Sequence, residues 1–344
     1  MRLPLAAVLL VLASLAPFSL SASTVEWIAS GALVVILYDG GASIGLRRFR
    51  VAAVPILSLG LLGTFATAGL LTLFAHVTFG LDWITSGLLG AAVAPTDPAV
   101  VFSVLGGHEL HGRTDTILEG ESGANDPVGI ALMLGLIELA THADASFWIV
   151  VRVFAEQMVI GLAVGGAAGL AARRVPRAGL PLAACAFGLA YVLHGSGFLA
   201  AFVAGLIAGA TVEAERLPKL AEIVVFVALG LTIDLSGIGG KHWAEGLALA
   251  AFLALVARPV VVGSLLLPVR LRAGERLFVM WAGLKGAVPI LLAAFAVTHH
   301  VDDAAGIYET VFVVVLASVV VQGGTIPYAT RRTLGVKPDT RTRS

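Results

Sequence analysis

The stretch Ala94-Pro95-Thr96-Asp97-Pro98 interrupts an apolar segment that runs from about residue 82 to residue 105. Each proline lacks a backbone N–H and frees a carbonyl one turn earlier, so an α-helix does not continue undisturbed through this stretch. In lipid, unpaired backbone groups beside a carboxylate are costly, and they are tolerated only where protein surrounds them or a cavity adjoins them. The stretch therefore predicts a discontinuous helix buried inside a membrane-embedded bundle.

The composition around this stretch is that of a membrane protein. Of the 344 residues, 58% are hydrophobic and only 13% are charged, whereas soluble domains carry about 25% charged residues. A spanning helix needs roughly 20 mostly apolar residues. The apolar segments predict an all-α polytopic membrane protein with about 12 transmembrane helices. The segments are approximately 5–20, 27–46, 53–76, 82–105, 115–140, 147–172, 179–195, 198–213, 220–238, 243–267, 273–298 and 307–328.

The basic residues support this segment count and predict an orientation. With the N-terminus placed in the cytoplasm, 18 of the 22 lysines and arginines fall in the termini and loops on the cytoplasmic side. Lys241 falls on the other side, and Arg152, Arg258 and Lys285 lie within segments. By the positive-inside rule, we expect a multi-pass protein of a bacterial cell membrane with both termini in the cytoplasm.

The first segment has two interpretations. A leucine-rich run followed by Ser21-Ala22-Ser23 is consistent with a cleaved signal peptide, although a retained helix is preferred, and cleavage would leave the downstream topology unchanged. We expect residues 1–330 to form one transmembrane domain and residues 331–344 a short cytoplasmic tail. The single cysteine, Cys185, excludes an internal disulfide framework. The sequence implies no cofactor and no nucleic-acid partner.

A second break, Gly283-Leu284-Lys285-Gly286-Ala287-Val288-Pro289, interrupts the segment 273–298 and again combines helix breakers with a charge. Segments three to five and ten to twelve therefore have matching contents, with the break in the middle member, and they cross the membrane in opposite directions. This pattern is typical of inverted repeats whose two discontinuous helices cross at mid-membrane, where transporters bind substrate. Proline kinks in a packed bundle would explain the prolines but not their paired positions.

The fifth segment carries the densest polar chemistry, Glu119 and Glu121-Ser122-Gly123-Ala124-Asn125-Asp126-Pro127. Helix positions three and four apart share a face, so Ser122, Asn125 and Asp126 point roughly one way. A hydroxyl, an amide and a carboxylate supply oxygen ligands for a hard monovalent cation. A carboxylate also takes up a proton when the cation leaves, so Asp126 is the leading candidate for an exchange site.

The other buried charges have structural explanations. We expect Glu121 to pair with a buried base, which is either Arg258 or Lys285. Half-helix ends carry partial charges, so Asp97 can offset facing N-terminal ends and Lys285 facing C-terminal ends. Asp97 can border the ion as well, and Asp39 is a candidate for the cytoplasmic approach to the site.

These motifs resemble the NhaP/NHE-like branch of the monovalent cation:proton antiporters. The first and third pieces below resemble in particular the potassium/proton antiporters called cell volume regulation protein A. The resemblance covers nearly the whole chain. In chain order, the matching pieces are Tyr38-Asp39-Gly40-Gly41, Thr96-Asp97-Pro98, Val101-Phe102-Ser103-Val104-Leu105-Gly106-Gly107, Glu121-Ser122-x-x-Asn125-Asp126, Phe198-Leu199-Ala200-Ala201-Phe202-Val203-Ala204-Gly205, Arg258-Pro259 and the second break itself.

The resemblance implies a secondary antiporter in which Asp126 is the exchanging carboxylate. It places Thr96, Asp97 and Ser122 around the Na⁺ or K⁺ ion, with Asn125 supporting the site. It also implies electroneutral exchange by a homodimer that works through an elevator-like motion in the lipid bilayer. Relatives usually have one more N-terminal helix and, in the volume-regulation group, a cytosolic domain after the last helix. Many relatives carry Arg where this chain has Lys285.

Two other classes of protein compete with this interpretation. An intramembrane aspartyl protease also uses two acids on neighbouring helices, but the Gly-x-Gly-Asp pattern usual around its second acid is absent. A cation channel needs rings of carbonyls or charges from several subunits, and no filter-like loop is present. Flux that strictly requires a counter-gradient of protons distinguishes an antiporter from both. The choice between Na⁺ and K⁺ depends on the size of the cavity that binds the ion, so the sequence leaves both ions as candidates.

Overall fold

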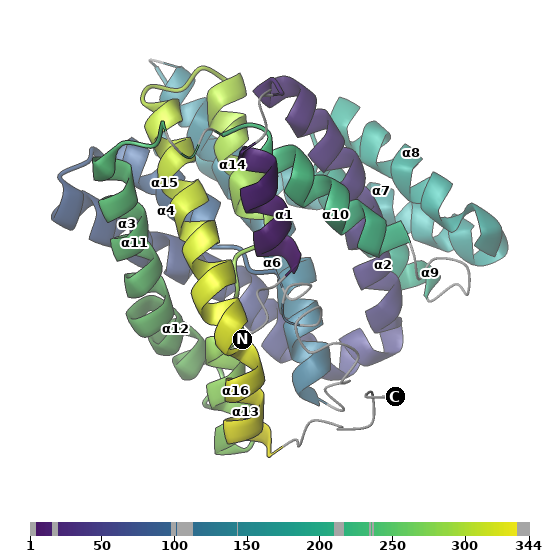
Figure 1. Ribbon diagram of the computed structural model, residues 1–344. Coiled ribbons are helices and arrows are strands. Elements are labelled where there is room, and N and C mark those ends of the chain that lie inside the picture. Colours follow the sequence, from purple (N-terminus) through teal and green to yellow (C-terminus); the bar gives the residue numbers. More distant parts are fainter. Residues whose placement is uncertain are drawn as a thin grey trace.

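The computed structural model describes residues 5–15, 20–97, 101, 113–142, 144–209, 217–233, 235 and 237–335. Pro98, most of the run 101–107 and residues 336–344 of the expected tail lie outside these ranges. Within them the chain is helical and contains no strand. The helices, labelled as in Figure 1, are α1 (Leu5–Ser14), α2 (Ala22–Leu57), α3 (Thr64–Phe79), α4 (Trp83–Val93), α6 (Arg113–Thr141), α7 (Phe147–Arg174), α8 (Gly179–Val192), α9 (Gly197–Ala208), α10 (Leu217–Gly230), α11 (Gly240–Phe252), α12 (Arg258–Leu265), α13 (Ala273–Trp281), α14 (Ala287–Thr298), α15 (Ala304–Ala317) and α16 (Gly324–Leu334).

Three short π-helical segments join some of these helices end to end. They are η1 (Ser58–Gly63), η3 (Leu253–Ala257) and η4 (Ser318–Gly323), and a 3₁₀ turn, η2 (Pro176–Ala178), precedes α8. The joined stretches match the long apolar segments of the sequence: η3 connects α11 to α12, and η4 connects α15 to α16. Because a π-helix shifts the register of the side chains, each segment turns a new face toward its neighbours.

The predicted all-α class is confirmed, and helix is found in every one of the apolar segments predicted from the sequence. Five helical stretches in the described ranges are long and apolar enough, by length and composition, to cross a membrane. They are Ser23–Phe79, Thr114–Thr141, Phe147–Arg174, Gly240–Leu265 and Ala304–Leu334. The helices α4 and α14 fall below that length, because the breaks divide the apolar segments that contain them.

The second and third segments are joined differently from the expectation. The sequence places Arg47, Arg48 and Arg50 between two segments, whereas the structure places them on the helix that includes Leu57. The interruption lies earlier, at Gly45, whose φ of 64° and ψ of 154° are not helical. Glycine adopts such angles without a steric penalty, so the chain bends there and resumes its helix at once.

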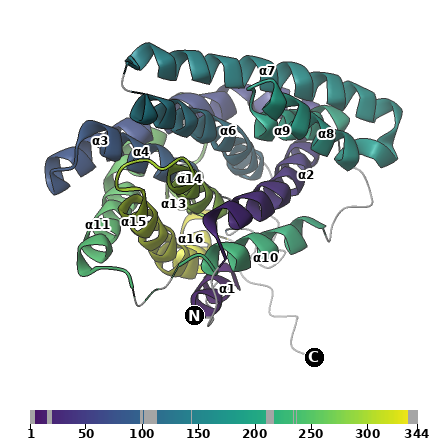
Figure 2. The same ribbon diagram turned by 90° about the horizontal axis from the view of Figure 1, so that it is seen from above.

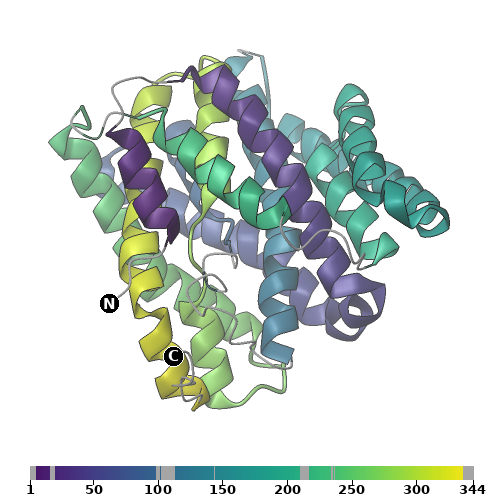
Figure 3. The ribbon, with the colours of Figure 1, turned by 45° about the vertical axis from the view of Figure 1, so that its right-hand side comes forward.

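The helices are arranged around a buried α14. Seen from above, α7 lies along one edge of the molecule, with α8 and α9 beside it, and α1 and α10 lie along the opposite edge (Figure 2). Figure 3 shows the teal α7 and α8 on one flank and the green and yellow helices of the C-terminal third on the other. All residues of α14 from Ala287 to Ala296 are buried, which makes this helix the centre of the packing.

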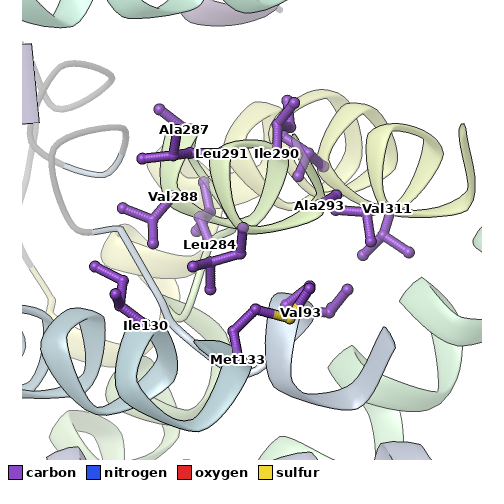
Figure 4. Close-up of a cluster of buried hydrophobic side chains, with 14 of the residues drawn as sticks. Val93, Ile130, Met133, Leu284, Ala287, Val288, Ile290, Leu291, Ala293 and Val311 are labelled. Carbon is purple, nitrogen blue, oxygen red and sulfur yellow. The ribbon is translucent and has the colours of Figure 1, made fainter. Parts of the chain in front are cut away.

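An apolar cluster holds α14 against three other helices (Figure 4). It joins residues of the second break and α14 to residues of α4, α6 and α15. Leu284, Leu291, Met133 and Val311 are fully buried in it. The labelled members are Val93, Ile130, Met133, Leu284, Ala287, Val288, Ile290, Leu291, Ala293 and Val311. The cluster excludes water from the side of the break on which it lies.

Close packing of α2 against α9 depends on two glycines. A Cβ at Gly205 would collide with the main-chain carbonyl of Tyr38, and a Cβ at Gly41 would collide with that of Phe202. Neither backbone can withdraw without separating the two helices. Small residues at helix crossings in membranes permit this kind of approach.

We predict that Gly205→Ala lowers the melting temperature of the protein in detergent, because the new methyl group forces α2 and α9 apart at a cost of about 1–3 kcal/mol. The matched control is Gly188→Ala on α8, where an added Cβ meets nothing within 4 Å. Alanine is favoured over glycine in helices by about 1 kcal/mol, so the control should melt at or above the wild type. Equal behaviour of the two variants in size-exclusion melting would contradict the packing argument.

Candidate functional site

The two breaks predicted from the sequence lie side by side. The helix α4 ends at Val93, and the chain is non-helical through Asp97, where this described range ends. The helix α13 ends at Trp281, and α14 begins at Ala287. The backbone N–H of Asp97 donates a hydrogen bond to the carbonyl of Leu284 at 2.8 Å. The two non-helical segments therefore contact each other directly through their main chains.

Lys285 binds the end of α4. Its side chain is fully buried, and Nζ donates hydrogen bonds to the carbonyls of Ala94 at 2.8 Å and Pro95 at 2.7 Å. These carbonyls carry the partial negative charge of a helix C-terminal end. The ammonium group thus lies at a C-terminal half-helix end, as the charge argument from the sequence proposes.

Arg258 binds both Glu121 and the end of α13. Its Nη1 and Nη2 donate to the Glu121 carboxylate at 2.8 Å and 3.2 Å, which makes a bidentate pair. Its Nε donates to the carbonyl of Met280 at 3.0 Å and Nη2 to that of Val279 at 3.1 Å. Of the two bases that the sequence leaves open as partners of Glu121, the structure selects Arg258, since Lys285 is already bound to carbonyls.

The carboxylate of Asp97 lies against the start of α14. A Cβ at Gly286 would collide with it, so the acid contacts the backbone immediately before Ala287. This is a helix N-terminal end, which carries partial positive charge and stabilises an anion. The glycine at position 286 is needed for that approach.

Asp126 lies on α6, buried and 5% exposed. Its Oδ1 has no hydrogen-bond partner among the described residues. Asp97 and Lys285 are the charged groups whose electrostatic fields act on it. A buried carboxylate oxygen without a hydrogen bond is costly unless a cation or a proton compensates it.

Asn125 and Ser122 accompany Asp126 on α6. The amide of Asn125 donates from Nδ2 to Thr96 Oγ1 at 2.8 Å, and its Oδ1 accepts a 3.4 Å bond from the Thr96 N–H. This pair of bonds holds the first break against α6. Ser122 is buried one turn before Asp126. Four of the five residues proposed around the ion, Thr96, Asp97, Asn125 and Asp126, are thus linked by hydrogen bonds, by electrostatic interaction or by adjacency in the chain.

Two further acids lie on other helices, and one of them interacts with this group. Asp39 on α2 is half-buried and interacts electrostatically with Glu119 of α6. No described contact joins it to Asp126. Glu222 on α10 interacts electrostatically with Asp97, and it is not among the site residues predicted from the sequence. The available signal was an acid within the apolar segment 220–238, which also contains Asp234, since acids in such segments are a mark of function in membrane proteins.

A small cavity adjoins the ion pair and Asn125. Its lining includes Thr64, Thr67, Glu121, Asn125 and Arg258. Hydroxyl, amide and carboxylate oxygens thus face a space of roughly the size of one water molecule. The site as a whole combines buried oxygens, one carboxylate with an unbonded oxygen, and fixed positive charges that occupy the broken helix ends.

A helical membrane bundle with two broken segments crossing beside a buried carboxylate defines the class of inverted-repeat secondary transporters. The transmembrane model of the sodium/hydrogen exchanger family matches residues 1–332. The chain belongs to that family, and it is therefore a multi-pass membrane protein of a transporter family rather than an enzyme. This excludes the aspartyl protease considered above.

Similar proteins carry antiporter names. The K(+)/H(+) antiporter NhaP of Alkalimonas amylolytica is 37% identical over 325 residues, which are 87% of this chain and 56% of that protein. The K(+)/H(+) antiporter NhaP2 of Shewanella sp. strain ANA-3 is 35% identical over 336 residues, 90% of this chain and 58% of that protein. This chain thus spans a little over half the length of these curated relatives.

One solved structure has the same fold. The sodium proton antiporter MjNhaP1 from Methanocaldococcus jannaschii at pH 8 superposes with a TM-score of 0.79 and 21% identity. The superposition covers 96% of this chain and 92% of that one. This likeness confirms the predicted fold class.

We predict that Glu121→Gln lowers the stability of the folded protein by about 3–5 kcal/mol, because it leaves the buried Arg258 charge without its anion. The matched control is Glu156→Gln on α7, whose partner Arg152 is 3.8 Å away and mostly exposed. An exposed pair contributes about 0–1 kcal/mol, so the control should melt near the wild type. Unchanged melting of Glu121→Gln together with altered ion selectivity would show that Glu121 acts on the ion and not on the fold.

Proposed function

We propose that the protein is a secondary antiporter that exchanges Na⁺ or K⁺ for protons. The observation that carries the proposal is the buried Asp126 carboxylate, whose Oδ1 has no hydrogen bond among the described residues. Such a group is stable when it holds either a cation or a proton. Because one carboxylate cannot hold both, binding of one ligand expels the other.

The neighbouring residues have distinct roles in this proposal. Asp126 binds the cation and the proton in turn, and Thr96, Asp97 and Ser122 supply further oxygen ligands to the Na⁺ or K⁺ ion. Asn125 keeps Thr96 in place through the 2.8 Å bond to its hydroxyl. The bases Lys285 and Arg258 occupy the broken helix ends and do not bind the ion. Asp39 lies on the cytoplasmic approach.

The names of the relatives support antiport without choosing the cation. Two of them are K(+)/H(+) antiporters, whereas the Na(+)/H(+) antiporter NhaP of Pseudomonas aeruginosa, 27% identical over 351 residues, is named for sodium. The discriminating experiment is a dequenching assay in everted vesicles. Na⁺, K⁺ and Li⁺ are added separately over a range of pH. Proton release that depends on an added cation supports an antiporter, and cation flux that moves no protons in return would indicate a channel.

We further propose a homodimer in the cell membrane, with both termini in the cytoplasm and a transmembrane domain over residues 1–330. The arginines placed on the cytoplasmic side by the sequence support the orientation. Labelling of single cysteines introduced near each end, in a variant with Cys185 replaced, tests it. Labels that react only after the membrane is permeabilised support the proposal.

We predict that Asp126→Asn abolishes antiport while the protein still folds and inserts. The amide has nearly the same shape as the carboxylate but cannot exchange a proton. Asp126→Glu should retain partial activity with altered cation affinity, since it keeps the acid and moves it. The measurement is cation-dependent proton release in vesicles, normalised to the amount of folded protein. Normal release from Asp126→Asn would overturn the assignment of the exchange site.

We also predict that exchange is electroneutral. If Asp97 stays ionised against the start of α14, only Asp126 changes its charge state, and one cation replaces one proton. A membrane potential acts on moved charge with about 2.3 kcal/mol per elementary charge per 100 mV, so it should not drive this exchange. The test uses proteoliposomes with a Na⁺ gradient, no pH gradient and a clamped diffusion potential. Proton flux that follows the potential would mean that a second group, most simply Asp97, also carries protons.

A further inference from the structure

A polar chain on the last helical stretch reaches the second break. Ser318 and Gln322 lie on η4 and are 3% and 5% exposed within an otherwise apolar segment. The hydroxyl of Ser318 accepts a hydrogen bond from the N–H of Lys285 at 3.0 Å and donates one to Gln322 Oε1 at 2.7 Å. Gln322 Nε2 donates to the carbonyl of Trp281 at 3.3 Å. Both ends of this row of hydrogen-bonded side chains therefore bind main-chain groups, at the break itself and at the end of α13 just before it.

The direction of these hydrogen bonds is fixed from both ends. The N–H of Lys285 can only donate and the carbonyl of Trp281 can only accept. The hydroxyl and the amide must therefore be oriented as described, since a rotated amide would set its oxygen against the carbonyl oxygen of Trp281. The side chain at position 322 therefore needs both an acceptor for Ser318 and a donor for the carbonyl of Trp281.

Ser318 and Gln322 form a brace that holds the segment 281–285, and this segment in turn positions the first break. Leu284, which lies between the two bonded residues, accepts the hydrogen bond from Asp97 N–H at 2.8 Å. The next residue, Lys285, binds the carbonyls of Ala94 and Pro95 through Nζ. A displacement of residues 281–285 would therefore displace Thr96 and Asp97 as well. Ser318 and Asp97 lie far apart in the sequence. Two hydrogen bonds, to the neighbouring residues Lys285 and Leu284, connect them.

The first break has its own brace of a different kind. There Asn125, on the helix that follows the break, binds Thr96 directly. In the second repeat, Ser318 and Gln322 come from η4, which continues α15, the next helix after α14. Each break is thus held by polar side chains from the next long helix. The first brace lies beside the exchange site, whereas the second acts from a distance through main-chain bonds.

We propose that Ser318 and Gln322 are positioning residues that set the cation affinity of the site by fixing where Thr96 and Asp97 lie, without contacting the ion. The proposal rests on the proposed function only for the identity of the bound cation. Loss of the brace should weaken cation binding, because the oxygens of the first break then sample more positions. It should not remove the exchanging carboxylate on α6.

The test compares Ser318→Ala and Gln322→Met with the wild type in proteoliposomes. The net value of one hydrogen bond, about 0.5–1.5 kcal/mol, predicts a rise of roughly two- to twelvefold in the apparent KM for the cation. The maximal rate per folded molecule should stay within about twofold. Ser318→Thr, which keeps the hydroxyl, should restore the wild-type KM. The matched control is Thr330→Val, because in the described part of the chain that buried hydroxyl donates within its own helix, to the carbonyl of Ile326.

A second measurement does not depend on transport. Cation binding stabilises the purified protein by RT ln(1 + [L]/Kd), so the Na⁺ or K⁺ concentration at which the melting temperature begins to rise reports the affinity. It should rise by the same factor in Ser318→Ala. If Gln322→Met does not fold, Gln322→Glu keeps the acceptor for Ser318 and loses the donor to Trp281.

The outcomes separate the two proposals. Weaker binding and a higher KM in both variants, with Thr330→Val unchanged, support the positioning role. A wild-type affinity in Ser318→Ala and Gln322→Met, with only less folded protein, would overturn it. Cation binding by the wild type without any proton exchange would overturn the proposed antiport and leave the positioning role supported by the melting data.

Discussion

Carbonyls freed by a break in a membrane-embedded helix have no water to bind, so donors from the protein must reach them. In this bundle the donor at the first break is the buried ammonium group of Lys285, bound to the carbonyls of Ala94 and Pro95. At the second break it is the guanidinium group of Arg258, bound to the carbonyls of Val279 and Met280. The two breaks are stable side by side because the C-terminal ends of α4 and α13 are each bound to a cation that belongs to the protein.

These fixed cations also define what the remaining acids can do. Glu121 is fully engaged with Arg258, and Asp97 lies against the start of α14. Asp126 differs from both, because one of its oxygens has no hydrogen bond in the described part of the chain. The charges that build the site and the charge that changes during the proposed cycle are therefore different groups, which lets the fold stay intact while the ligand alternates.

Much of this arrangement follows from local chemistry in the sequence. Prolines and a buried charge within apolar segments predicted both breaks, and helix periodicity grouped Ser122, Asn125 and Asp126. The partner of Glu121 could not be chosen, because Arg258 and Lys285 are both buried bases and only the crossing decides which carbonyls each must bind. The bend at Gly45 was missed because nearby arginines resemble a loop. Glu222, Ser318 and Gln322 were missed because an isolated polar residue acquires meaning only from what it contacts.

The π-helical segment η4 has a consequence for how related sequences are compared. A π-turn accommodates one residue more than an α-turn, and such bulges arise most simply as single-residue insertions. Ser318 and Gln322 both lie in this segment, Ser318–Gly323, between α15 and α16. Deleting one residue between them would turn one side chain by about 100° relative to the other, while leaving the hydropathy of the segment nearly unchanged. A one-residue gap at this position in an alignment therefore marks a change in how the second break is held, and it should not be treated as neutral variation in helix length.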